Sequence, residues 1–396
     1  MHDKREEKGL KMTIYILYSA DYELYLGGNY CDENEVLINP TKDLLNLFDK
    51  LNIPLTLFAD VLSFLRYREQ KLFGFPESAE NQLKDAIRRG HDVQSHVHPH
   101  WNFTQIEGRT YKVNADFFLL GKLDDDPEKL YAKIRNLLMT SRSYLHDLLG
   151  TVNKNYQCIA FRAGGYGLQP NSAIVMKALR DSGFVIDSSI VPGFVLKNKI
   201  NEVDFSMVPK MANYYLDSDL TTPSKNNQGI FEIPLASCTF SIVQNFLSQF
   251  SYYSLKFFRA RSGQGASAPS AVKEKGYPIQ QVPKKNSARK PKHSKLYNFF
   301  VETIDNCFNY LDCSTDDEKM FQCTKTYLKH FDVVNKDVFF AFNMHPKGMT
   351  KDHFAALEKY HHKLTGYYQG NIQAIRYQQA AEMLVKNGLK TKTDSN

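Results

Sequence analysis

The chain has 396 residues, of which 42% are hydrophobic and 23% are charged, and its formal net charge at pH 7 is +7. This composition excludes global disorder, and the lack of an uncharged apolar run of roughly 18 residues argues against a transmembrane helix. Residues Met1–Lys8 are mostly charged and lack the apolar stretch of an export signal. We therefore expect a cytoplasmic protein whose six cysteines are free thiols.

The positive charge is concentrated in one segment. Residues 256–295 carry eleven Lys or Arg and one acid, Glu274, so the rest of the chain has a net charge of −3. Small, polar and Pro-containing stretches make up most of this segment, and they bury too little apolar area to offset the entropy of ordering. We predict that 256–295 is a disordered basic loop inserted in the fold, and that 1–11 and 391–396 are flexible termini.

Apolar runs of strand length alternate along the chain with longer amphipathic stretches. Strands are expected at 12–18, 54–59, 91–94, 157–161, 184–186, 230–233, 338–342 and 372–375. Helices are expected at 41–51, 78–89, 126–149, 171–182, 351–364 and 377–387. Strands separated by helices of ~10–15 residues favour a parallel sheet or (β/α) barrel of the α/β class.

Residues able to bind metal or move protons follow several of these predicted strands. They are Asp21 and Glu23, then His96, His98 and His100, then Arg162, Asp187 and His345. The carboxyl ends of parallel strands share one face, which holds the active site in folds of this class. We therefore expect side chains that are far apart in sequence to meet at one mouth.

Two groups within this set favour a metal site. His96 and His100 are four residues apart, a spacing that on a helical turn presents both imidazoles to one side and leaves His98 pointing away. Asp21 and Glu23 add two carboxylates, and two histidines with one carboxylate leave open positions on a metal for water and substrate. Each group also has a purely structural interpretation. In that interpretation the histidines form a surface turn, and the two acids cap a loop. The later pair His361-His362 is expected to be solvated surface.

The ordered set of motifs resembles that of the NodB-homology polysaccharide deacetylases, carbohydrate esterase family four. Ser19-Ala-Asp-Tyr-Glu23 is similar to the first, acidic motif in a spaced form, and Ser95-His-Val-His-Pro-His100 to the second. Phe161-Arg-Ala-Gly-Gly-Tyr-Gly167 resembles the third motif, Arg-Pro-Pro-Tyr-Gly, and Asn343-Met-His-Pro346 resembles the late Leu-x-His motif. The resemblance covers about residues 12–240 and 335–390, and it implies a single, distorted seven-stranded barrel over 12–390.

The resemblance also implies a role for each matched residue. Asp21 would be the general base for the attacking water, Arg162 would hold Asp21 ionised, and protonated His345 would donate to the leaving nitrogen. The metal ligands would be Glu23, His96 and His100, with zinc as the implied metal.

Two features depart from the family pattern. The fourth motif, an Asp-Trp pair, has no clear match, since the single tryptophan, Trp101, follows the histidine cluster. Asp187 is the candidate for the acid that orients His345. Glu23 is one methylene longer than the family's Asp ligand, which leaves the identity of the metal open.

Three functions are compatible with these observations. The leading hypothesis is metal-dependent removal of an N-acetyl or similar acyl group from an amino sugar or polysaccharide precursor, possibly nucleotide-linked or lipid-linked. The alternative enzyme is a deformylase or another non-peptide amide hydrolase with the same site. A third hypothesis is a catalytically degenerate protein that contacts anionic membranes through 256–295. Nucleic acid is disfavoured as a partner because Tyr277 is the one aromatic between Arg259 and Lys295.

Overall fold

A computed structural model of the chain describes residues 14–25, 32–108, 110–198, 200–245, 307–333 and 336–386. Its central element is a nine-stranded sheet, and strand β1 (Ile14–Tyr22) is buried over its whole length. Strands that are covered on both faces are rich in apolar residues without alternation, which explains the continuous runs in the sequence. The apolar core lies on both sides of this sheet.

The remaining strands of the central sheet are short. They are β2 (Thr56–Asp60), β3 (Asp92–Val97), β6 (Ala160–Ala163), β7 (Ile186–Asp187), β10 (Tyr214–Leu216), β11 (Ile230–Glu232), β14 (Val338–Phe342) and β15 (Ile372–Ala374). Three separate hairpins pair β4 (Gln105–Glu107) with β5 (Thr110–Lys112), β8 (Val195–Lys197) with β9 (Glu202–Asp204), and β12 (Ser237–Thr239) with β13 (Phe308–Tyr310).

Backbone hydrogen bonds join the two ends of the curled sheet. The strand order is β10-β11-β7-β6-β3-β2-β1-β14, with β15 pairing the first part of β1. All of these pairs are parallel except β10 with β11. Just after β11, Leu235 forms a parallel bridge with Ala341 of β14, whose N–H donates to the Pro234 carbonyl at 3.0 Å. The strands β1, β2, β3, β6, β7, β11 and β14 thereby form a distorted barrel.

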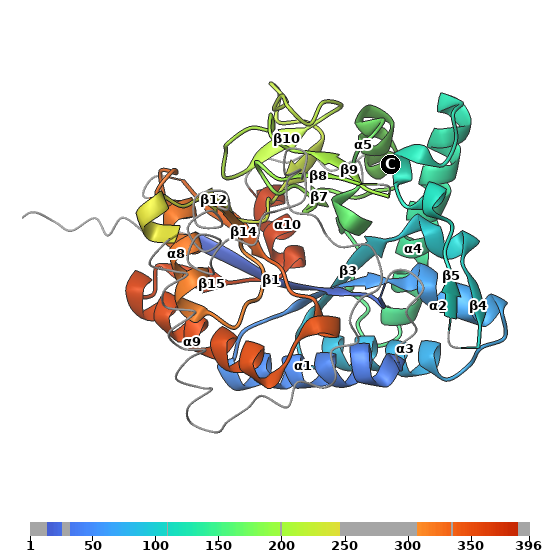
Figure 1. Cartoon of the computed structure of the whole chain (residues 1–396), viewed down its shortest axis with the longest axis horizontal. Coiled ribbons are helices and arrows are strands. Elements are labelled where there is room, and N and C mark those ends of the chain that lie inside the picture. The colour runs from blue at the N-terminus through green and yellow to red at the C-terminus, as the bar shows by residue number, and fades with distance from the viewer. Residues whose placement is uncertain are drawn as a thin grey trace, which may run out of the picture.

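Helices lie around the outside of this barrel (Figure 1). They are α1 (Asn39–Leu51), α2 (Val61–Glu69), α3 (Phe75–Arg88), α4 (Pro127–Leu149), α5 (Ser172–Asp181), α8 (Asp317–Leu328), α9 (Lys351–Tyr368) and α10 (Tyr377–Lys386). Helix α4 begins where Asp126 Oδ1 accepts the N–H groups of Glu128 and Lys129, a typical N-cap. Among the described helices, none combines the length and apolar character needed to cross a membrane.

The predicted α/β barrel is confirmed, and most predicted elements lie within a few residues of the observed ones. Several parts differ: β1 continues past residue 18 to Tyr22, and the helices α2 and α8, the strand β10 and the strands of the three hairpins were not predicted. The predicted loop at 256–295 and the predicted flexible termini lie outside the described residues. The division into one barrel with an insert therefore stays a prediction.

Candidate metal centre and acid–base cluster

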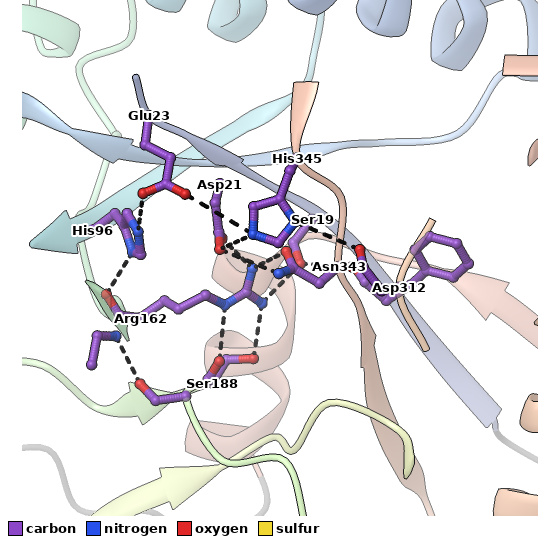
Figure 2. Close-up of polar contacts among 12 residues, drawn as sticks. Ser19, Asp21, Glu23, His96, Arg162, Ser188, Asp312, Asn343 and His345 are labelled. Carbon is purple, nitrogen blue, oxygen red and sulfur yellow. Dashed lines mark hydrogen bonds and ion pairs between the residues drawn. The ribbon is translucent and has the colours of Figure 1, made fainter. Parts of the chain in front are cut away.

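Four parallel strands bring polar side chains to one end of the barrel (Figure 2). Strand β1 stays extended through Asp21, so Asp21 and Glu23, two residues apart, point to the same side. His96 on β3 and Arg162 on β6 are register partners in neighbouring parallel strands. His345 follows β14 by three residues. The structure thus brings the side chains of Asp21, Glu23, His96, Arg162 and His345 together.

Arg162 is the centre of a buried hydrogen-bond network. Its side chain is 0% exposed, and it donates to Asp21 Oδ1 and to Asn343 Oδ1, each at 2.7 Å. It also donates to the Ser19 hydroxyl at 2.8 Å and to the Ser188 carbonyl at 2.9 Å. Burial by itself would raise the pKa of Asp21, but the Arg162 guanidinium holds that pKa well below its usual range. Asp21 is therefore an ionised carboxylate held in a fixed position.

Glu23 and two histidines face one another beside this network. Nε2 of His98 contacts Oε2 of Glu23, and Nε2 of His96 lies 3.4 Å from the same oxygen. The two Nε2 atoms are 3.1 Å apart. Nδ1 of His96 donates to the Arg162 carbonyl at 2.8 Å, so in the neutral ring the lone pair is on Nε2. Burial would raise the pKa of Glu23, but Lys347, whose Nζ is 2.8 Å from Oε1, holds it well below its usual range.

His98 completes this group of three, and the expectation that it points away is wrong. Strand β3 ends one residue before His98, whose backbone is still extended (φ −107°, ψ 99°). Because side chains two residues apart on an extended chain share a face, His96 and His98 point the same way. The helical spacing assumed for His96 and His100 does not apply, since only His100 lies in the 3-10 turn Pro99–Phe103.

His100 lies next to the group rather than inside it. Its ring centroid is 5.3 Å from that of His98, and it stacks on Phe118 at 4.6 Å. Both ring nitrogens are buried and have no hydrogen-bond partner in the described part of the chain. Burial, and then His98, lower the pKa of His100 well below its usual range, so the ring is neutral. Metal ligation by His100 stays a prediction.

The donor set fits a divalent metal. Glu23, His96 and His98 each offer a ligand atom within 4.8 Å of the others, and Asp21, Glu23 and His345 form a second such group. Two imidazole nitrogens and a carboxylate oxygen are donors that zinc accepts. Glu23 Oε2 is buried and its nearest polar neighbours are the two imidazole Nε2 atoms, so a cation placed among these three atoms would satisfy all of them.

His345 lies between two carboxylates. Its Nε2 is 3.4 Å from Asp21 Oδ2, and its Nδ1 is 3.6 Å from Asp312 Oδ1. Burial would lower the pKa of His345, but Asp21 and Asp312 raise it to about 10, so the ring is protonated at neutral pH. The orienting position predicted for Asp187 is thus occupied by Asp312. Asp187 instead accepts a hydrogen bond from the Ser189 hydroxyl at 2.7 Å.

Sequence reasoning missed three acidic or basic residues of this cluster. Asp312 follows β13, a short hairpin strand whose sequence has no apolar run from which it could be predicted. Lys347 lies two residues after His345, in the turn Pro346–Gly348. Asp60 directly follows the predicted strand 54–59, so the rule that selected Asp21 could have found it. Burial raises the pKa of Asp60 to about 6.

Comparisons with known proteins give likenesses of fold. No family model and no curated protein matches the chain. A candidate polysaccharide deacetylase from Mycobacterium smegmatis aligns with a TM-score of 0.46 and 12% identity, covering 96% of this chain and 93% of that one. The Puue allantoinase aligns with a TM-score of 0.43 and 12% identity, covering 95% of this chain and 91% of that one. A GH57 branching enzyme from Thermococcus kodakaraensis has a TM-score of 0.43 and 10% identity, with 94% and 71% covered.

Proteins named as polysaccharide deacetylases are among those matched. The matched proteins are named for different reactions, so the chemistry of this chain has to be argued from its own side chains.

Proposed function

We propose that this protein is a metal-dependent hydrolase of a non-peptide carbon–nitrogen bond, which removes an acyl group, with acetyl as the first candidate, from an amino sugar. One observation carries the proposal. Oδ2 of the ionised Asp21 and Nε2 of the protonated His345 lie 3.4 Å apart. Both are next to Glu23, His96 and His98, the candidate metal ligands. Amide hydrolysis needs a base, an acid and an electrophile in one place.

Asp21 and His345 would divide the proton transfers between them. A water held near Glu23 would lose a proton to Asp21 as its oxygen attacks the acyl carbon. His345 would donate its Nε2 proton to the leaving nitrogen, because a free amine is a better leaving group than an amide anion. A divalent cation in this site supplies Lewis acidity to the water and to the acyl carbonyl.

Neighbouring side chains keep Asp21 ionised and His345 protonated. Arg162 stabilises the carboxylate form of Asp21, and Asn343 Nδ2 donates to Asp21 Oδ2 at 3.2 Å. Asp312 stabilises the imidazolium of His345. The His345 side chain is 30% exposed whereas those of Asp21 and Glu23 are nearly buried, so substrate would approach from the His345 side.

The test combines metal analysis with a substrate panel. Purified full-length protein should bind about one equivalent of zinc or cobalt, lose activity with a chelator and regain it with metal. The panel contains N-acetyl and N-formyl amino sugars and a cyclic amide, scored by released acetate, formate or amine. Asp21→Asn should lower kcat by about 10²–10⁴ and still bind metal. A protein that binds metal in stoichiometric amount but turns over no amide on the panel would overturn the assignment.

The same site would serve a deformylase, and the ratio of formate to acetate release decides between them. Zinc as the metal and a carbohydrate as the substrate are part of this proposal. The membrane hypothesis depends on residues 256–295, which lie outside the described part of the chain, so it gains no support from the structure.

A further inference from the structure

Asp60 is a buried acid at the carboxyl end of β2 that the proposed chemistry does not use. It is 0% exposed, and neither carboxylate oxygen has a hydrogen-bond partner of good geometry among the described residues, although the backbone N–H of His98 acts on it. Buried carboxylates without partners are rare in folded proteins and call for a reason such as a nearby cation.

Strand register places the Asp60 side chain on the inner face of the barrel. Asp60 pairs with His96 across the parallel strands β2 and β3, and such partners point to the same side. Phe58, two residues earlier on the same face, lies under the Arg162 guanidinium, 4.1 Å from its ring centroid. The side chain of Asp60 therefore points toward the cluster rather than toward the helices.

The neighbours of Asp60 are the proposed metal-binding residues. The charged groups with the largest effect on the pKa of Asp60 are His98, then His96, then Glu23. Asp60 is absent from both groups whose donor atoms lie within 4.8 Å of one another. Asp60 therefore shares the inner face of the barrel with His96 without being one of the residues whose donor atoms converge.

We propose that Asp60 is a positioning residue of the metal centre, an outer carboxylate that strengthens cation binding by Glu23, His96 and His98. This inference rests on the proposed function, because it requires a metal at that site. A buried negative charge lowers the energy of a divalent cation and of the histidines that ligate it. Outer partners of this kind change metal affinity by about 10–100-fold.

The experiment measures zinc affinity of the full-length protein by competition with a chromophoric chelator, without any substrate. Asp60→Asn, which keeps the shape and removes the charge, should weaken zinc binding about 10–100-fold. Asp60→Glu, which restores the charge, should recover part of that loss. The matched control is Asp92→Asn at the opposite end of β3, where the buried carboxylate already accepts hydrogen bonds from Val93 N–H and Gln94. It should bind zinc within about threefold of wild type.

Each outcome is decisive. Folding is checked by a cooperative thermal transition without metal, and Asp60→Ser replaces Asp60→Asn if the latter does not fold. Unchanged zinc affinity in the folded variant, or an Asp60→Glu protein as weak as Asp60→Asn, would overturn the role of Asp60 alone. A wild-type protein that binds no metal would instead overturn the proposed function.

Discussion

The ring of His98 lies directly against the backbone of Gly164. A Cβ atom at Gly164 would be 2.5 Å from Nδ1 and 2.6 Å from Cγ of that ring, closer than non-bonded atoms approach. The turn after β6 therefore needs a residue without a side chain at this position so that His98 can face Glu23. Gly164 therefore shapes the candidate metal site although it offers no ligand.

Replacing Gly164 with Ala should displace the His98 ring and weaken zinc binding by about tenfold or more. The measurement is the zinc dissociation constant, with the thermal transition as a check on folding. Gly348→Ala is the control, since a Cβ there would meet nothing within 4 Å. Wild-type affinity in Gly164→Ala would show that His98 does not hold the metal.

Replacing Asp312 with Asn should lower the pKa of His345, because Asp312 helps to hold that ring protonated. The sign follows from the charge: with one carboxylate fewer, the imidazolium loses its proton at a lower pH. The alkaline limb of kcat/KM, which reports the essential acid, should move to lower pH. Asp187→Asn is the comparison, and if that variant moves the limb instead, Asp187 orients His345.

Replacing Arg162 with Met should lower the free energy of unfolding by about 3–5 kcal/mol, because Asp21 would remain as a buried charge without its main partner. Urea unfolding measures this loss. Lys50→Met removes an exposed ion pair with Glu358 and should cost less than about 1 kcal/mol. Equal effects of the two substitutions would contradict the structural importance of the Arg162 network.

His361 should make the protein less stable in mild acid. It was expected on the surface but is buried, and its Nδ1 shares a hydrogen bond of 3.1 Å with the Tyr18 hydroxyl. Burial, and then His362, lower its pKa to about 4, while an unfolded histidine has a pKa of about 6.5. The unfolded chain therefore binds the proton more tightly between these values, and stability falls as the pH drops from about 6.5 to 4.

The measurement is unfolding by urea as a function of pH. At pH 5 this linkage amounts to at most about 2 kcal/mol, and His361→Gln should remove it. His362→Gln, at the exposed neighbouring position, removes only the smaller of the two causes and should keep most of the pH dependence. A His361→Gln protein with the wild-type pH profile would rule out this contribution.

The sequence predicted those elements whose burial leaves a long apolar signature. The run Val338–Phe342 is a strand with the predicted bounds, since all five of its residues are buried. Strand β1 was predicted too short because Ser19 and Asp21 look like loop residues, although both are buried where Arg162 binds them. The end of a strand whose polar residues contribute to a functional site is therefore predicted as a loop from the sequence alone.

The candidate site was predictable in its residue types but not in its detail. The choice between His98 and His100 depends on whether the chain after β3 is extended or helical, and Pro99 allows both readings. The sequence did not predict Asp312 as a residue of the site, because its position depends on a hairpin of two three-residue strands. Contacts between distant segments leave no local pattern in a sequence.

The pairing of β1 with β14 also governs the order in which the protein can be assembled on the ribosome. Asn343 and Asp21 are 322 positions apart, so β1 can pair early with β2 on one edge but must wait for β14 on the other. Until then an apolar strand with one open edge is available to other nascent chains, which makes early protection by chaperones valuable. Truncation before residue 338 should leave a product that cannot reach the native state.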